Sequence, residues 1–225
     1  MILNLARRED RYYFALGSLK TLQFPDHVIT RFITHDGRDY PDVEAIRKAA
    51  IKDGFSYLKD FEPYSRTTAA WIWSWRCALR EIADKDRTTL LLIDDYTLKH
   101  GWTYDRVCRL IDECRRRAQD HGRLRILQLA HTHRSDEVIK HLHEPYSSML
   151  AKGIAGTSNY ATILTGAGAE LLLKVGEMEP LDYPATDFGK LTSRQDEREY
   201  FRGTWHTLDE ICENSYDLGT DLGDG

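Results

Sequence analysis

The pattern of apolar and polar residues divides the chain into short apolar runs and longer stretches with helical spacing. The apolar runs, which predict strands, are residues 1–5, 28–33, 88–93, 125–130 and 160–164. The stretches with apolar residues three or four positions apart, which predict helices, are residues 10–22, 41–53, 67–83, 103–120 and 165–175, with a short helix from Ser135. After Pro180 the pattern loosens.

Strands and helices alternate in this pattern, which indicates βαβ units and an α/β fold with a mainly parallel central sheet. The continuous apolar run at residues 88–93 is typical of a strand in the middle of such a sheet. No repeat or linker divides the chain, so we expect one domain over residues 1–215 and a flexible acidic tail over residues 216–225. Ligands of such sheets bind at the carboxyl ends of the strands.

Two predicted helices carry aromatic residues that bear on which face is buried. In the first, the apolar positions are Tyr13, Phe14, Leu16, Leu19 and Leu22. In the third, Trp71, Trp73 and Trp75 alternate by two, so they cannot share one face. We expect Trp71 and Trp75 in the core; Trp73 is a candidate for stacking on a sugar, with core packing as the alternative.

Charge and cysteine content narrow the class of protein. The 225 residues include 31 basic and 36 acidic side chains, a net charge of -5, which argues against a nucleic-acid partner. The four cysteines are scattered and predict reduced thiols. Neither a membrane-spanning stretch nor a secretory signal is recognisable, so a cytoplasmic location is expected.

The segments that follow the predicted strands carry the candidate chemistry. After the first strand, Arg7 and Arg11 lie where a helix begins, and guanidinium groups there suit a diphosphate. The alternative is that Arg7 and Arg8 are solvated and Asp10 caps the helix. After the second strand, Asp36 and Gly37 form a turn whose acid is either structural or a nucleoside ligand. After the 88–93 run, Asp94 and Asp95 are either solvated loop acids or a site for Mg²⁺ or Mn²⁺.

Other candidate motifs are weaker. His131 and His133 form an H-x-H pair without an evident third ligand. Gly166 and Gly168 lack the spacing of a phosphate-binding loop, so small residues at a helix start explain them better.

The order of these motifs resembles that of glycosyltransferase family 25, which contains lipopolysaccharide glycosyltransferases and procollagen galactosyltransferases. The opening residues Ile2, Asn4, Leu5, Arg7, Arg8, Asp10 and Arg11 resemble the family's I-N-L-x-R-R-x-D-R start. Asp36-Gly37 matches its D-G step, and Leu91 to Asp95 lies where the family has an apolar strand ending in E-D-D. Two later stretches, from Gly156 to Leu172 and at Pro180-Leu181-Asp182, resemble further family motifs.

The resemblance implies a GT-A fold and a glycosyltransferase that moves a sugar from a nucleotide sugar, a UDP-sugar above all, to an acceptor hydroxyl with inversion. The acceptor would be a glycan, a lipid-linked molecule or a protein. The resemblance assigns nucleotide-sugar binding to the following residues: Asn4, Leu5, Arg7, Arg11, Asp36, Gly37, Ser74 and Asp94. It assigns a divalent metal (Mn²⁺ or Mg²⁺) to Asp95 and His206, and makes Asp182 and Asp187 the candidates for the catalytic base.

The chain departs from the family at two positions. Ile93 replaces the first acid of E-D-D, and Trp75 replaces the histidine of an S-H pair that begins at Ser74. Two other functions therefore stay open. One is a nucleotidyl- or phosphotransferase on a similar sheet, since paired acids also suit phosphoryl chemistry. The other is a carbohydrate-binding module without catalytic activity.

Overall fold

The computed structural model describes residues 1–55, 65–121, 123–130, 150–152, 160–178, 204–207 and 211–214. Its strands are β1 (Ile2–Leu5), β2 (Arg31–Thr34), β3 (Thr89–Ile93), β4 (Tyr96–Leu98), β5 (Ile126–Gln128), β6 (Leu150–Lys152), β7 (Ala161–Leu164), β8 (Thr204–Thr207) and β9 (Cys212–Asn214). Its helices are α1 (Glu9–Thr21), α2 (Val43–Lys52), α3 (Arg66–Lys85), α4 (Tyr104–His121) and α6 (Gly166–Met178), with 3-10 turns η1 (Asp26–Val28) and η2 (Gly37–Asp39). The helix expected from Ser135 and the 216–225 tail lie outside the described residues.

Seven of the strands form one sheet in the order β2-β1-β3-β7-β5-β8-β6, and β4 pairs with β9 in a second ladder. β1 runs parallel to β2 and to β3, and β5 runs parallel to β8. β7 is antiparallel to both of its neighbours, β3 and β5, and β6 is antiparallel to β8. The predicted α/β class is confirmed, but the sheet is mixed, and β3 has a parallel neighbour on one side only.

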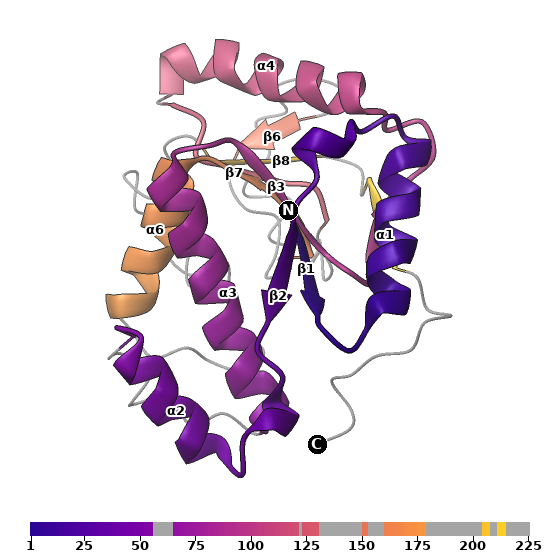
Figure 1. Cartoon of the computed structure of the whole chain (residues 1–225). Helices are drawn as coiled ribbons and strands as arrows, with labels where there is room; N and C mark the ends of the chain where they lie inside the picture. Colours follow the sequence, from indigo (N-terminus) through magenta and orange to yellow (C-terminus); the bar gives the residue numbers. More distant parts are fainter. Residues whose placement is uncertain are drawn as a thin grey trace, which may run out of the picture.

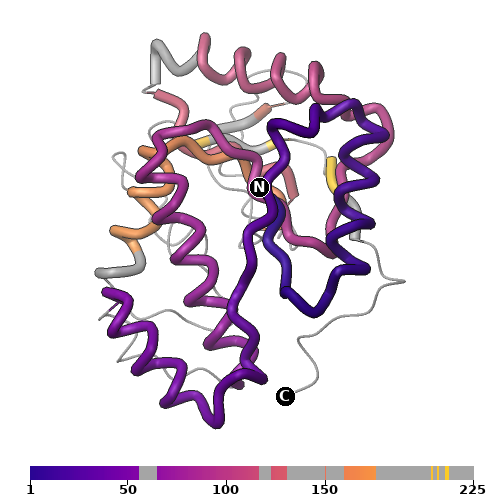
Figure 2. The backbone as a smooth tube through the Cα atoms, viewed as in Figure 1, coloured from indigo at the N-terminus to yellow at the C-terminus, as the bar shows by residue number. Residues whose placement is uncertain are grey.

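Helices cover both faces of this sheet (Figure 1). α3 and α6 lie side by side on one face, α1 lies on the other, and α4 crosses the end of the sheet at which β1 and β2 begin. Leu91 of β3 packs in the core beneath α3 and α6, whereas its neighbour Leu92 packs in the core shared with α1 and α4. Because β3 has covered faces on both sides, its apolar run is continuous rather than alternating. Figure 2 shows the N-terminus in the middle of the molecule, between α1 and α3.

The buried face of α1 differs from the one that its apolar residues suggest. Tyr13 and Phe14 are 62% and 44% exposed, and the face turned to the sheet carries Arg11, Ala15 and Leu19. Arg11, Ala15 and Leu19 recur every four residues, so they lie along one side of the helix. The predicted helix is confirmed, but a buried arginine such as Arg11 is not visible in an apolar pattern, so the apolar residues do not by themselves mark the buried face.

The tryptophans of α3 are also placed differently from the prediction. Trp75 is buried as expected, but Trp73 is buried too, stacked on the ring of His35 with centroids 3.5 Å apart. Its indole Nε1 donates to Asp53 Oδ2 at 3.2 Å. Trp71 is only partly buried. Trp73 is therefore a core residue, and Trp71 is the tryptophan that remains accessible.

Side chains at the helix starts explain where several helices begin. Asp42 Oδ1 accepts from Ala45 N at 2.8 Å at the start of α2, and Ser65 Oγ accepts from Thr68 N at 3.1 Å before α3. Thr103 Oγ1 accepts from Arg106 N at 3.4 Å before α4. These contacts satisfy N–H groups that have no partner within the helix. Among the described helices, none is long and apolar enough to cross a membrane.

Candidate functional site

A pocket of about 110 Å³ opens at the carboxyl ends of β1, β2 and β3. Its lining residues come from the ends of these strands, from α1, from α3 and from the start of β7: Leu3, Asn4, Leu5, Arg11, Thr34, His35, Asp36, Gly37, Thr67, Trp71, Ile93, Asp94, Asp95 and Tyr160. Seven of the ten candidate residues for nucleotide-sugar and metal binding are among them. The volume is below the roughly 300–1,000 Å³ of whole-ligand pockets, so it suits one part of a larger ligand.

Asp94 is the most buried acid of this pocket, at 5% exposed. It follows β3 directly, and its N–H donates to Leu3 O of β1 at 3.1 Å, which holds the turn against the sheet. Burial raises the pKa of Asp94 to about 6. A hydrogen bond from Asn4 acts in the opposite direction, the negative charge of Asp95 adds to the rise, and Arg11 and Arg8 oppose it.

Asn4 connects Asp94 to the rest of the sheet. Its amide Nδ2 donates to Asp94 Oδ2 at 2.5 Å and to Arg8 O at 2.8 Å. Its Oδ1 accepts from Arg31 Nε at 2.8 Å. The amide thus meets a donor on one side and two acceptors on the other, which an aspartate or a leucine at this position could not do. Asn4 is 1% exposed, so these contacts fix the orientation of the Asp94 carboxylate.

Arg11 supplies positive charge to the pocket from α1. It is 4% exposed, and its NH1 lies 3.7 Å from Asp94 Oδ1. This distance permits a Coulombic attraction without a short hydrogen bond. Arg11 therefore offsets part of the acidic charge at the carboxyl end of β3.

Asp36 and Gly37 form the second side of the pocket. Asp36 accepts from Arg7 Nε at 2.5 Å and from Arg38 N at 3.0 Å. Burial alone would raise the pKa of Asp36, but these two donors outweigh it and lower the pKa. A Cβ on Gly37 would lie 2.6 Å from the Arg66 carbonyl carbon, so only glycine allows η2 to pack against the start of α3.

Arg7 itself is outside the pocket lining. Its guanidinium is held by Asp36, so it reaches a bound phosphate only if that ion pair opens.

Aromatic side chains complete the walls of the pocket. Trp71 lies one helical turn after Thr67 on α3, and both line the pocket. Tyr160 lies opposite, where its carbonyl accepts from Ile93 N at 3.0 Å, and its ring stacks on Tyr96 at 4.3 Å. Flat apolar walls of this kind suit a nucleobase or a sugar face. Sequence reasoning missed Thr34, His35, Trp71 and Tyr160 as lining residues.

Ser74 is not brought to the pocket. It is fully buried, its Oγ donates to Ala70 O at 2.7 Å, and it accepts from His35 N at 2.7 Å. Its hydroxyl therefore holds the end of β2 against α3. Trp75, next to it, is buried in the core beneath α3, 2% exposed.

The metal assignment depends on Asp95, because both oxygens of Asp94 face Asn4 or Arg11. Asp95 lines the same pocket, and a single carboxylate together with phosphate oxygens is a common set of ligands for Mg²⁺. The donor set therefore fits a metal that is held jointly with a ligand. Among the described residues, no three His, Cys, Asp or Glu side chains converge on one point.

His206 lies in β8, level with Gln128 of β5. β8 is three strand positions from β3, which corresponds to roughly 14 Å across the sheet. The side chain of His206 lies outside the described residues, as do Asp182, Asp187, His131, His133 and the Pro180-Leu181-Asp182 step. Their predicted roles stay predictions.

No known family model matches the chain, and no curated protein matches its sequence. The geometry of the pocket is thus the basis for assigning a function. The pocket combines a buried carboxylate, a second carboxylate, a buried guanidinium and two aromatic walls. Such a site can bind a polar ligand with a flat ring and a phosphate or ribose group.

Proposed function

We propose that this chain is a glycosyltransferase of the GT-A type, with a nucleotide-diphosphate sugar as donor and the pocket at the carboxyl ends of β1, β2 and β3 as its binding site. The observation that supports the proposal most is that sequence motifs far apart in the chain line the same pocket. The motifs after β1, β2 and β3 are separated by up to about ninety residues, and they line one pocket. Because β1, β2 and β3 run parallel, their carboxyl ends share one edge of the sheet, which is where ligands of α/β sheets bind.

Each residue has a proposed role that fits its surroundings. Asp36 accepts hydrogen bonds from the nucleoside, and Trp71 or Tyr160 stacks on a ring of the ligand. Arg11 attracts the diphosphate, while Asn4 and Asp94 hold the pocket floor. Asp182 or Asp187 is the proposed base that takes the proton of the acceptor hydroxyl as it attacks the anomeric carbon.

A divalent ion would sit at Asp95 and would supply positive charge that stabilises the departing nucleoside diphosphate. The residues of this chain do the rest. Asp95 would hold the ion, and Arg11 adds a second positive charge beside the phosphates.

The test is binding of UDP, GDP and UDP-sugars, with Mn²⁺ or with EDTA, followed by the free energy of unfolding. Ligand at about a hundred times its dissociation constant stabilises the protein by roughly 2.7 kcal/mol. Transfer is then measured as release of nucleoside diphosphate together with a new glycoside. Asp95→Asn is expected to abolish the Mn²⁺-dependent part of the binding. The matched control is Asp105→Asn, which removes an exposed acid at the start of α4 and leaves binding unchanged.

Results of three kinds would contradict the proposal. If no nucleotide stabilises the protein, the pocket is not a donor-binding site. If pyrophosphate is the product, the protein is a nucleotidyltransferase. If the Asp95→Asn variant and the wild type depend equally on Mn²⁺ for binding, the metal is held by residues other than Asp95.

One observation favours a second function, a nucleotide-sugar-binding module without transfer. Ile93 stands where the family has an acid, and Trp75 is buried where the family has a histidine. Tight binding of a UDP-sugar with no turnover on any acceptor would support this function over the first.

A further inference from the structure

A second and larger cavity, of about 540 Å³, lies at the opposite edge of the sheet from the candidate pocket. It opens where β1 and β3 begin, between the end of α3, the segment around η1 and the underside of α4. Figure 1 shows that α4 crosses this edge, while the arrowheads of β1 and β2 point to the other one. The volume is within the range of cavities that hold a whole small molecule.

Apolar side chains form a large part of the wall of this cavity, beside polar and charged residues. From α4, the residues Tyr104, Cys108 and Ile111 line it. They recur at a spacing of three or four and are only partly buried. A separate stripe of the same helix, Val107, Leu110 and Cys114, is nearly completely buried in the core.

The facing wall is formed by Val28, Ile29 and Leu90. Val28 is 39% exposed, and the other two are partly buried. α4 thus carries more apolar surface than the core uses. Covering such surface is favourable by about 25 cal/mol per Å².

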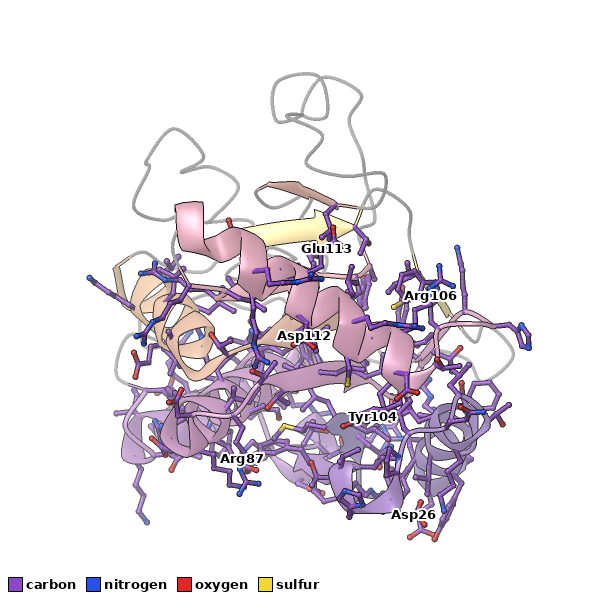
Figure 3. All side chains as sticks on the ribbon, turned by 90° about the horizontal axis from the view of Figure 1, so that it is seen from above. Asp26, Arg87, Tyr104, Arg106, Asp112 and Glu113 are labelled. Atoms are coloured by element: carbon purple, nitrogen blue, oxygen red, sulfur yellow. The ribbon has the colours of Figure 1, made fainter. Side chains whose placement is uncertain are left out.

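Among the lysine, arginine, aspartate and glutamate side chains of the rim, one has no ion pair within the described residues. Met1 also lines the cavity, where its amino group donates to Leu90 O at 2.8 Å. Lys85 Nζ pairs with Glu81 Oε1 at 2.6 Å, and Arg115 NH1 lies 3.6 Å from Asp112 Oδ1. Arg87, at the link between α3 and β3, makes no side-chain ion pair or hydrogen bond within the part of the chain that the structure describes. Figure 3 shows Tyr104 and Asp112 on the side of α4 that faces Arg87, whereas Glu113 and Arg106 lie on its other side.

We propose that this cavity binds a long-chain carboxylate, with its hydrocarbon chain between α4 and β3 and its carboxylate beside Arg87. The volume and the lining support this occupant, because apolar side chains of α4 and of the facing wall border a space of about 540 Å³ that suits a hydrocarbon chain. The charge of the rim indicates the head group of the ligand, because the Arg87 guanidinium is outside the two ion pairs of the rim and can pair with a carboxylate.

The experiment uses the whole chain and titrates it calorimetrically with octanoate, decanoate and dodecanoate below the concentrations at which they form micelles. The affinity is expected to rise about fourfold for each added methylene until the chain fills the cavity. Dodecanol, which lacks the charge, is expected to bind about tenfold more weakly than dodecanoate. Absence of binding by every carboxylate of the series, or equal affinity for dodecanol, would overturn the proposal.

Two variants place the ligand in the cavity. Arg87→Gln is expected to lower the affinity for dodecanoate about tenfold and to leave dodecanol unchanged. Its control is Arg109→Gln, which removes an exposed arginine of α4 that does not line the cavity. Cys108→Trp, which fills the cavity, is expected to abolish binding of both ligands. Equal loss in Arg87→Gln and Arg109→Gln would refute the head-group assignment.

A measurement on the wild type tests the proposal even if the Cys108→Trp variant does not fold. The Cys108 thiol lines the cavity, so bound dodecanoate is expected to slow its alkylation at least tenfold. Unchanged alkylation of Cys108 at saturating dodecanoate would place the ligand elsewhere. Concentration-dependent dimerisation that Cys108→Trp abolishes would assign the cavity to a second copy of the chain and would overturn the proposal.

Discussion

Replacement of Asp94 by asparagine tests whether the pocket holds a charge that folding disfavours. Asp94 is 5% exposed, and burial raises its pKa from 3.8 to about 6. The folded protein therefore binds this proton more tightly than the unfolded chain does. The contribution to stability is fully present below pH about 4 and is lost as the pH rises through about 6. A shift of about two pKa units corresponds to about 3 kcal/mol.

Two effects of the substitution oppose each other. Asparagine is neutral at every pH and keeps an oxygen that accepts from Asn4, so the cost of burying the charge disappears. Arg11, 4% exposed, loses an opposite charge at 3.7 Å, and an unpaired buried charge can cost about 3–5 kcal/mol. The raised pKa of Asp94 already includes the attraction to Arg11, so desolvation of Asp94 is the larger effect. We expect Asp94→Asn to be about 1–3 kcal/mol more stable than the wild type at neutral pH.

The assay is urea unfolding followed by tryptophan fluorescence from about pH 4 to pH 8, with EDTA present so that no metal pairs with the acids. The advantage of Asp94→Asn is expected to shrink to near zero at about pH 4, where Asp94 is protonated. The control Asp84→Asn removes an exposed acid of α3 and should change stability by less than about 0.5 kcal/mol at any pH. A variant that is less stable than the wild type at neutral pH, or a difference that does not depend on pH, would refute this reasoning.

Three further predictions concern local geometry. Gly37→Ala is expected to destabilise the protein by about 1–3 kcal/mol, because its Cβ would lie 2.6 Å from the Arg66 backbone. Gly17→Ala is expected to stabilise α1 by about 0.5–1 kcal/mol, because no atom lies within 4 Å of its Cβ. Urea unfolding measures the free energy of both variants. Asp42→Ala removes the cap of α2 and is expected to cost about 1 kcal/mol by the same assay, and an unchanged midpoint would contradict the capping role. Burial raises the pKa of Cys77 to about 12, so its alkylation at pH 8 should be at least about a hundredfold slower than that of a free thiol, and rapid labelling of Cys77 would show that the site opens.

The sequence predicted the parts of the fold that depend on local pattern. The apolar run at β3 and the helical spacing of α3 each have one dominant local cause, and each was found. The strands of three or four residues, such as β4 and β6, carry too few positions for any period to show. The direction of β7 was not predictable either, because the residues of a strand do not encode whether its neighbour runs parallel or antiparallel.

The candidate pocket was partly predictable for a similar reason. The rule that ligands bind at the carboxyl ends of strands led to Asp36, Asp94 and Asp95, and the same rule would have included His35 had it been applied to the whole turn. Trp71 was missed because helical spacing shows which residues share a face but not which face meets the sheet. Tyr160 was missed because the rule considers residues that follow strands, whereas Tyr160 precedes β7. Since β7 is antiparallel to β3, the start of β7 lies beside the carboxyl end of β3.

The antiparallel direction of β7 has a consequence for how this pocket can vary. The chain enters β7 beside the end of β3, so Tyr160 meets the pocket on the way into a strand, whereas Leu164 leaves β7 at the far edge. Exchanges at Tyr160 itself would therefore reshape the pocket and leave the edge at which α6 begins unchanged. Exchanges just after Leu164 would change that opposite edge instead, so Tyr160 is the position of β7 at which a new ligand preference could be introduced.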